Sequence, residues 1–461
     1  MQQESITNPA IVVPLKEKIS YGLGDLGNNF LFDMGQLYLL KFYTDSLGLP
    51  PATAGLVFLI TKIWDAFADI TIGTWVDNRK KIGKRGRFRP FMLYAAIPLA
   101  ILTVVSFTTP NFSLTGRTIW AFATYIAFGT VYSIFNIPYG SMIPAMTRNV
   151  VERSDLASWR WGGANTGLLL TTVGFMPIVL AFDSMQTGYL IAAAVFALAG
   201  LGLQLICYAN VKERYTVKKP EREKGAILKD YKSLLKNAPL LVLCIVNLLT
   251  FSAFNVKLAV QVYYCQYSLN NTLIVSKMGF FAIGCVYIGV FLTPLLVRRY
   301  GKKAIYIAGA IIWAIADLLA WFYANTLISF IIFACLAFFG SSFINTLNWA
   351  LISDAVEYGE WKTGNRSEGL VYSSFTFFRK LSQALAGSIP GLVLAMVGYV
   401  ANTEQTPQAL AGIRGLMFIY PGVLAVATFI IMYFCYKLTD SKSKEIIAEL
   451  NERRIKKEDL I

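Results

Sequence analysis

Residues 240–267 read LLVLCIVNLLTFSAFNVKLAVQVYYCQY, an apolar stretch that a short polar run, Asn255 to Gln261, interrupts near its middle. The stretch is longer than the about 20 apolar residues that a helix needs to cross a bilayer. Lys257 would then lie deep in the membrane, where a lysine costs about 3 kcal/mol on insertion scales. The sequence therefore predicts a transmembrane helix whose lysine meets an anion, either a carboxylate of the protein or a negatively charged substrate.

The composition indicates an integral membrane protein. Of the 461 residues, 56% are hydrophobic and only 15% are charged, whereas about a quarter of a soluble protein is charged. The net charge of +15 comes from short basic runs between apolar segments, a pattern typical of membrane topology and not of a nucleic-acid-binding face. Without histidine or CxxC spacing, the sequence offers no histidine-based catalytic or metal site. We expect no enzymatic activity, no metal, no cofactor and no nucleic-acid partner.

The hydropathy pattern predicts an all-α protein with the polypeptide crossing the membrane repeatedly. Segments of about 20 mostly apolar residues recur along the chain, separated by polar loops. We count twelve, near residues 19–45, 52–76, 90–108, 117–146, 158–181, 187–208, 238–267, 273–298, 304–323, 328–356, 368–398 and 412–437.

The basic loops predict the orientation of these segments. Loop 77–89 carries seven Lys and Arg residues and loop 298–303 reads RRYGKK, whereas the alternate loops have almost no positive charge. Positive loops stay on the cytoplasmic side of a membrane. Since every basic loop falls on one side of the count, we expect both termini in the cytoplasm and the chain in a bacterial cytoplasmic (inner) membrane.

A charged linker divides the segments into two sets of six. We predict an N-terminal half at 1–208, a cytoplasmic linker at 209–237, a C-terminal half at 238–437 and a cytoplasmic tail at 438–461. Each half has a basic loop after its second segment, the mark of a parallel internal repeat. Such a repeat predicts a substrate cavity between the halves, near the middle of the bilayer.

The second segment carries charged residues in its interior. Lys62, Asp65 and Asp69 are spaced i, i+3 and i+7, which places them on one helix face. Two neighbouring carboxylates in a membrane favour a site for a coupling cation, Na⁺ or H⁺. A structural salt bridge with Lys62 or Lys380 is the alternative.

Polar residues also line the first segment. Asp25, Asn29 and Asp33 are spaced by four residues, with Asn28 beside them. Such a stripe faces a bundle interior or an aqueous path. Buried amides elsewhere could grip substrate hydroxyls or could hold helices together; they are Asn136, Asn345 and Asn348.

Two more cations lie within apolar segments. Arg160 is about one turn inside the fifth segment between Trp159 and Trp161, so it is either a site residue or an interfacial anchor. Lys380 lies roughly 18 Å into the eleventh segment, at 1.5 Å per residue, too deep to reach water easily. Asp317 in the ninth segment is predicted to be buried, without an assigned role.

Several motifs together resemble a known family. They are YGLGDLGNNF at 21–30, IWDAFADITIG at 63–73, IPYGSMIPAMT at 137–147 and SDAVEYGEWKTGNRSEG at 353–369. These motifs, in this order, are similar to those of the glycoside-pentoside-hexuronide:cation symporters, a melibiose-permease-like branch of the major facilitator superfamily. The resemblance implies alternating access by two six-helix halves, with a sugar site and a nearby Na⁺, Li⁺ or H⁺ site.

The resemblance also implies roles for individual residues. The family's cation-site carboxylates match Asp65 and Asp69, its helix-five arginine matches Arg160, and its helix-eleven lysine matches Lys380. The chain departs from the melibiose permease in ways that bear on the substrate. Asn29 and Asn136 stand where that permease has aspartates, and that permease has no lysine matching Lys257. Ala68 replaces an asparagine of the family's cation site, which leaves H⁺ coupling, or no coupling, open.

These departures predict an anionic substrate, since acids are lost and a cation is gained. The combination resembles the branch that serves sulfosugar breakdown, whose cargo is sulfoquinovose or dihydroxypropanesulfonate. A hexuronide symporter, a neutral glycoside or pentoside symporter, and a sulfonate exporter without cation coupling are the alternatives. We expect a monomer. The predicted substrate-binding residues are Asn28, Asn29, Asp33, Asn136, Arg160, Lys257, Gln261, Asn345 and Lys380.

Overall fold

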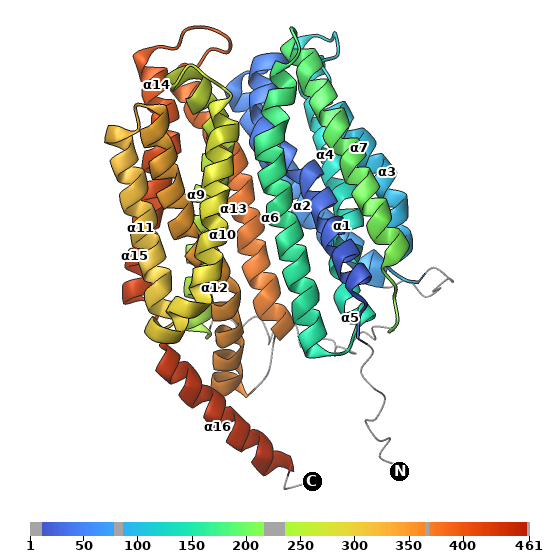
Figure 1. Ribbon diagram of the computed structural model, residues 1–461, viewed down its shortest axis with the longest axis vertical. Coiled ribbons are helices and arrows are strands. Elements are labelled where there is room, and N and C mark those ends of the chain that lie inside the picture. The colour runs from blue at the N-terminus through green and yellow to red at the C-terminus, as the bar shows by residue number, and fades with distance from the viewer. Residues whose placement is uncertain (1–11, 78–85, 216–235, 365–367, 459–461) are drawn as a thin grey trace. The chain divides into compact units, whose positions relative to one another are not determined.

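The computed structural model describes residues 12–77, 86–215, 236–364 and 368–458 (Figure 1). The chain is built of long helices, several of which continue into short π-helical segments (η). The first elements are α1 (Leu15–Met34), η1 (Gly35–Leu39), η2 (Phe42–Ser46), α2 (Pro51–Asp77), α3 (Arg89–Ser106), α4 (Leu114–Gly140), α5 (Met142–Met146), α6 (Val150–Leu180) and α7 (Met185–Asn210).

The remaining elements follow residue 236. They are α9 (Ala238–Tyr263), η3 (Tyr264–Ser268), α10 (Ile274–Tyr300), α11 (Lys302–Tyr323), α12 (Leu327–Thr363), α13 (Glu368–Met396), α14 (Pro407–Arg414), η4 (Gly415–Ile419), α15 (Tyr420–Phe434) and α16 (Asp440–Glu458). Each of the twelve predicted segments coincides with helix. The prediction of an all-α membrane fold is confirmed.

Nine spans in the described part of the chain are long and apolar enough to cross a membrane. The predicted spans in α1, α2 and α13 are not among these nine. These are the helices that carry Asp25 and Asp33, Asp65 and Asp69, and Lys380 respectively. Each of these three helices thus carries charged residues inside its predicted span.

The chain groups into two compact units. The N-terminal unit comprises residues 1–49 and 63–220, and the C-terminal unit comprises residues 50–62 and 221–461. The start of α2 thus groups with the second unit. The predicted linker 209–237 falls mostly on residues outside the described ranges, and the predicted division into halves stays a prediction.

Small residues let helices approach closely within each unit. In the N-terminal unit, a methyl group added at Gly163 of α6 would collide with the carbonyl oxygen of Gly22 in α1. In the C-terminal unit, a methyl group on either Gly309 of α11 or Gly340 of α12 would lie 2.7 Å from the carbonyl oxygen of the other. These contacts fix α1, which carries Asp25, against α6, which carries Arg160, and fix α11, which carries Asp317, against α12.

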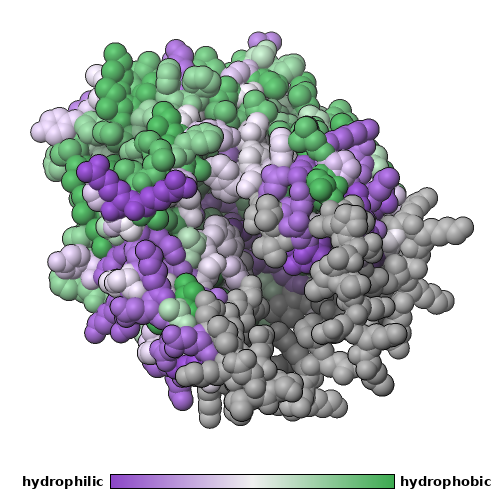
Figure 2. All heavy atoms as spheres, turned by 60° about the horizontal axis from the view of Figure 1, so that its bottom comes forward, coloured by the Kyte–Doolittle hydropathy of each residue, from purple (hydrophilic) through white to green (hydrophobic). Residues whose placement is uncertain are grey.

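The C-terminal tail forms an amphipathic helix, α16. Ile446 and Leu450 are buried against the C-terminal unit, whereas Lys442 and Lys444 are exposed. Figure 2 shows hydrophilic side chains gathered on the face that lies at the bottom of Figure 1, next to largely hydrophobic surface. This distribution is the one expected where a membrane protein leaves the bilayer.

Candidate functional site

Lys257 of α9 forms a buried ion pair with Asp317 of α11. The two side chains are 2% and 0% exposed. The Nε1–H of Trp313 donates to the other carboxylate oxygen of Asp317, over 2.8 Å, and the Phe418 ring centre lies 5.8 Å from Lys257 Nζ. Of the two anions that the sequence allowed for Lys257, the structure therefore contains the protein carboxylate. The binding of substrate by Lys257 stays a prediction.

A buried amide lies one turn beyond this lysine. Gln261 is 0% exposed, and neither its Nε2 nor its Oε1 has a hydrogen-bond partner among the described residues. Residues four apart share a helix face, so Gln261 and Lys257 point to the same side of α9. Buried polar atoms without partners are rare in folded proteins, which makes this face of α9 a candidate for ligand binding.

Two π-helical segments adjoin the same pair. η3 continues α9 directly after Tyr263, and η4 contains Phe418. The rings of Tyr264 and Phe418 meet edge to face with their centres 5.0 Å apart. Since π-helical turns occur frequently at functional sites, their position around Lys257 supports the same candidate.

Arg160 of α6 pairs with Asp25 of α1 in the N-terminal unit. Its Nε lies 2.9 Å from Asp25 Oδ2, and the two side chains are 26% and 10% exposed. The guanidinium carbon lies 4.7 Å from the ring centre of Tyr139. Tyr139 and Tyr21 each donate their hydroxyl to the backbone carbonyl of the other. Arg160 is thus held inside the unit by a carboxylate and an aromatic ring.

The predicted amides of α1 and α4 differ in their hydrogen-bond partners. Asn28 Nδ2 donates to Asn136 Oδ1 and to the Tyr132 hydroxyl of α4, each over 3.2 Å. Asn29 instead donates to the carbonyl oxygen of Asp25, four residues earlier on its own helix. The structure therefore joins Asn28 to Asn136 across α1 and α4, and turns the Asn29 amide back along α1.

The last predicted residue of α1 is a buried carboxylate. Asp33 is 7% exposed, and its Oδ2 has no hydrogen-bond partner among the described residues. An oxygen in this condition is available to a substrate hydroxyl or to a cation. Among the predicted substrate-binding residues, Asn28 Oδ1 and both polar atoms of Gln261 also lack a hydrogen-bond partner within the described ranges.

The candidate coupling residues lie in the second half of α2. Asp65 and Asp69 are both half-buried. The Asp65 carboxylate packs so closely on Gly129 of α4 that a methyl group there would collide with it. Within the described ranges, no group of three Cys, Asp or Glu residues is arranged to hold a metal ion, so a cation at Asp65 and Asp69 would need further oxygen ligands.

Two predicted residues lie on C-terminal helices. Asn345 of α12 and Lys380 of α13 are half-buried. Asn348, one turn along α12 from Asn345, accepts a hydrogen bond from the Tyr306 hydroxyl of α11 over 3.1 Å. Asn348 therefore acts as a link between helices in this structure.

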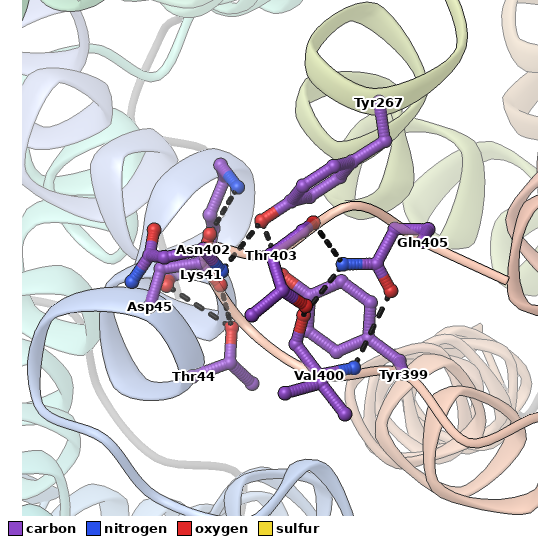
Figure 3. A network of polar contacts seen from close by, with 9 residues as sticks. All are labelled: Lys41, Thr44, Asp45, Tyr267, Tyr399, Val400, Asn402, Thr403 and Gln405. Atoms are coloured by element: carbon purple, nitrogen blue, oxygen red, sulfur yellow. Dashed lines mark hydrogen bonds and ion pairs between the residues drawn. The ribbon is translucent and has the colours of Figure 1, made fainter.

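One buried lysine within the first span, Lys41, was not among the residues predicted from the sequence. It is 0% exposed and pairs with Asp45 over 2.6 Å, and Thr44 also donates to Asp45 over 2.6 Å (Figure 3). The i, i+4 spacing of opposite charges in YLLKFYTD is the signal that could have found this pair.

Figure 3 also shows a polar network within the C-terminal unit. The Tyr399 hydroxyl donates to the Tyr267 hydroxyl over 3.0 Å, and the Asn402 backbone N–H donates to the same oxygen over 3.1 Å. Gln405 Nε2 donates to the Thr403 carbonyl over 2.9 Å. The turn between α13 and α14 is therefore held by Gln405 within the turn and by Tyr267 of η3.

Residues 20–440 match the model of a family described as "MFS/sugar transport protein". The chain belongs to this family. A protein of Salmonella typhimurium, provisionally named a 2,3-dihydroxypropane-1-sulfonate exporter, is 52% identical over 98% of this chain and 99% of its own length. A protein of Escherichia coli, provisionally named a sulfoquinovose importer, is 48% identical over 96% of this chain and 95% of its own length.

Solved structures of other MFS transporters share the fold. A variant of the nucleoside transporter NupG superimposes with a TM-score of 0.66 at 14% identity, covering 90% of this chain and 100% of that chain. A bacterial homologue of the lysosomal transporter Spinster gives a TM-score of 0.64 at 12% identity, covering 94% and 97%. These two structures show the shared fold alone. As a member of the MFS sugar transport family, this protein is a multi-pass membrane transporter and not an enzyme, as predicted.

Proposed function

We propose that this transporter carries a sulfonated sugar or its three-carbon product, sulfoquinovose or 2,3-dihydroxypropane-1-sulfonate, by alternating access. The observation that carries the proposal is the sequence identity of this chain with two relatives, 52% and 48% along almost its whole length. The name of each relative specifies a sulfonated compound as its substrate. The transmembrane cations fit such cargo, since ammonium and guanidinium groups bind anionic oxygens with charge-assisted hydrogen bonds.

The candidate binding groups fall into two chemical classes, each suited to a different part of the substrate. Cationic side chains meet the sulfonate, and amides or carboxylates with spare hydrogen-bonding capacity meet the hydroxyls. In the N-terminal unit the candidates are Asn28, Asn29, Asp33, Asn136 and Arg160. In the C-terminal unit they are Lys257, Gln261, Asn345 and Lys380.

Transport is coupled, in this proposal, to Na⁺ or H⁺ at Asp65 and Asp69. Two half-buried carboxylates spaced four residues apart on α2 offer oxygen ligands for a cation, or a place for a proton. Export of a sulfonate without coupling is the alternative. It is favoured by the name of the Salmonella typhimurium relative, an exporter.

A hexuronide is the second candidate substrate, because it is also an anionic sugar. A glucuronide carrier protein homologue of Escherichia coli is 36% identical over 96% of this chain and 96% of its own length. A neutral glycoside or pentoside is the third candidate. It is the cargo expected if the intramembrane cations serve structure alone.

The setting proposed for this activity is a bacterial cytoplasmic membrane, with both termini in the cytoplasm. The seven Lys and Arg residues of loop 77–89 support this orientation. We propose a monomer that works without a cofactor and without nucleic acid.

Counterflow in proteoliposomes tests the function. Vesicles loaded with unlabelled dihydroxypropanesulfonate or sulfoquinovose should accumulate the labelled compound, and glucuronate or melibiose should compete weakly. Each measurement is repeated with and without Na⁺ and at two pH values, which identifies the coupling ion. Saturable counterflow of melibiose, with none of either sulfonate, would overturn the proposal.

A further inference from the structure

The Lys257–Asp317 pair combines a fixed carboxylate with a movable ammonium group. Asp317 is held on its own helix by Trp313, which donates from four residues earlier over 2.8 Å. Lys257 ends a flexible four-carbon chain. Among the described residues, Asp317 is the one hydrogen-bond acceptor found for its Nζ. An ammonium group has three N–H donors, so it keeps donors that a second anion could use.

We propose that Asp317 is an internal counter-ion that competes with the anionic substrate for Lys257. In the empty transporter the carboxylate neutralises the lysine. When the sulfonate binds, its oxygens take over the donors of Lys257, and when it leaves, Asp317 recovers them. Asp317 is thus a positioning residue that sets how readily substrate is released. This inference rests on the proposed function, because it takes the cargo to be an anion.

The side chain of Gln261 is independent evidence that a ligand binds beside Lys257. Its side chain is 0% exposed, and both polar atoms of its amide lack partners in the described part of the chain. An unsatisfied buried polar group costs about 1–3 kcal/mol. A ligand that contacts Lys257 could accept from Nε2 and donate a hydroxyl to Oε1, because Gln261 follows Lys257 by one turn on the same face.

Phe418 and the π-helical segments provide the surroundings for such an exchange. Phe418 lies in η4 with its ring centre 5.8 Å from Lys257 Nζ, and Tyr264 at the start of η3 packs on that ring. These two aromatic rings exclude water. Their presence strengthens the interaction of Lys257 with Asp317 and its interaction with a sulfonate. The balance between Asp317 and the sulfonate therefore decides the affinity.

If the Lys257–Asp317 pair only stabilised the fold, Asp317→Asn would have a different effect on sulfonate affinity. Removing one partner of a buried pair leaves an uncompensated charge and destabilises the protein. Under that reading, Asp317→Asn lowers the melting temperature and leaves sulfonate affinity unchanged or weaker. Under the counter-ion proposal, the same variant binds sulfonate more tightly, because the lysine no longer has a competing carboxylate.

The test measures the Kd of dihydroxypropanesulfonate for the purified full-length protein by calorimetry, together with its counterflow rate in proteoliposomes. For Asp317→Asn we expect a Kd about tenfold lower and a maximal counterflow rate about tenfold lower. Asp45→Asn is the matched control, since it opens an equally buried pair outside the proposed site, and we expect its Kd to equal that of the unaltered protein.

A second variant keeps the proposal testable if Asp317→Asn does not fold. Lys257→Met combined with Asp317→Leu removes both charges, so we expect it to fold and to lose sulfonate binding. Sulfonate binding at the original Kd in this double variant, or an unchanged or higher Kd in folded Asp317→Asn, overturns the counter-ion role. Failure of the unaltered protein to bind any sulfonate refutes the proposed function instead.

Discussion

Each unit contains a transmembrane base that is paired with one acid among the described residues, and the two pairs differ in their surroundings. Arg160 and Asp25 are 26% and 10% exposed and lie against Tyr139. Lys257 and Asp317 are 2% and 0% exposed. Arginine has a rigid planar fork, whereas lysine carries a compact charge on a flexible chain. The comparison indicates a fixed cation in the N-terminal unit and an exchangeable one in the C-terminal unit.

The neighbours of the two pairs reinforce this difference. Next to Arg160, the hydroxyls of Tyr21 and Tyr139 are satisfied by backbone carbonyls. Next to Lys257, Gln261 has a fully buried amide that lacks partners among the described residues. Satisfied polar groups rigidify a structure, whereas unsatisfied ones mark a place where something else binds. We therefore expect the C-terminal pair to control substrate affinity more strongly.

The largest expected effect comes from removing each pair without leaving a lone charge. Lys257→Ala with Asp317→Ala should lower sulfonate counterflow by about 100-fold, since a charge-assisted contact to the sulfonate is lost. Arg160→Ala with Asp25→Ala should lower it by about tenfold. The two double variants are compared by their counterflow rates at equal protein density in the vesicles. An equal loss of counterflow in the two double variants, or a larger loss in the Arg160 variant, would contradict the assigned roles.

The melting temperatures of these variants provide the control. A double variant with both charges removed should melt near the unaltered protein, whereas Lys257→Ala alone leaves Asp317 as an unpaired buried charge and should destabilise the protein by about 3–5 kcal/mol. If both forms melt alike, Asp317 has another partner when Lys257 is absent.

The second prediction separates coupling from binding. Asp65→Asn keeps the shape of the side chain and removes its charge. We expect sulfonate binding to persist while the dependence of uptake on Na⁺ or on pH is lost. Uptake driven by an imposed Na⁺ or pH gradient measures the effect, with Asp33→Asn as the parallel variant on α1. Unchanged ion dependence in Asp65→Asn would remove this residue from the coupling site.

Most helix positions could be predicted from the sequence because the length of an apolar segment indicates a membrane-spanning helix. Residues 240–267 form α9 with η3, as the apolar run predicts. The π-helical segments could not be predicted, since they change the hydrogen-bonding pattern without changing the hydropathy. The predicted spans in α1, α2 and α13, which carry charged residues, are not among the nine spans that are long and apolar enough to cross a membrane in the described part of the chain.

Partners of the buried charges were harder to predict than the charges themselves. The sequence required an anion for Lys257, but Asp317 lies 60 residues away, and no local spacing joins them. The available signal was that both charges lie deep in spans that start on the same side of the membrane. Asn28 and Asn136 were both proposed as site residues, yet their mutual hydrogen bond follows only from the packing of α1 on α4.

The third prediction concerns packing in the N-terminal unit. A methyl group at Gly163 would collide with the carbonyl oxygen of Gly22, so Gly163→Ala should destabilise the protein by about 1–3 kcal/mol. Thermal unfolding in detergent measures the loss. Gly162→Ala is the matched control, because a methyl group there would have no described atom within 4 Å apart from its chain neighbours and its own helix backbone. Its melting temperature should be unchanged or slightly higher.

The smallest expected effect lies in α16, outside the membrane. Hydrogen bonds from Trp361 Nε1 and from Arg453 lower the pKa of Glu449 below its ordinary value of 4.5. A carboxylate with a lowered pKa stabilises the folded state above its ordinary pKa and loses this contribution as the pH falls through the lowered value. We expect the Trp361 fluorescence to change only below pH 4.5. Glu449→Gln should abolish this change, and its persistence would show another origin.

The most direct test of the account is the Kd of dihydroxypropanesulfonate in Asp317→Asn, measured beside the unaltered protein. The account predicts tighter binding with slower counterflow, since the lysine of α9 then has the substrate as its one anionic partner. Weaker or unchanged binding in a folded variant would contradict it, and would make the Lys257–Asp317 pair a support for helix packing alone.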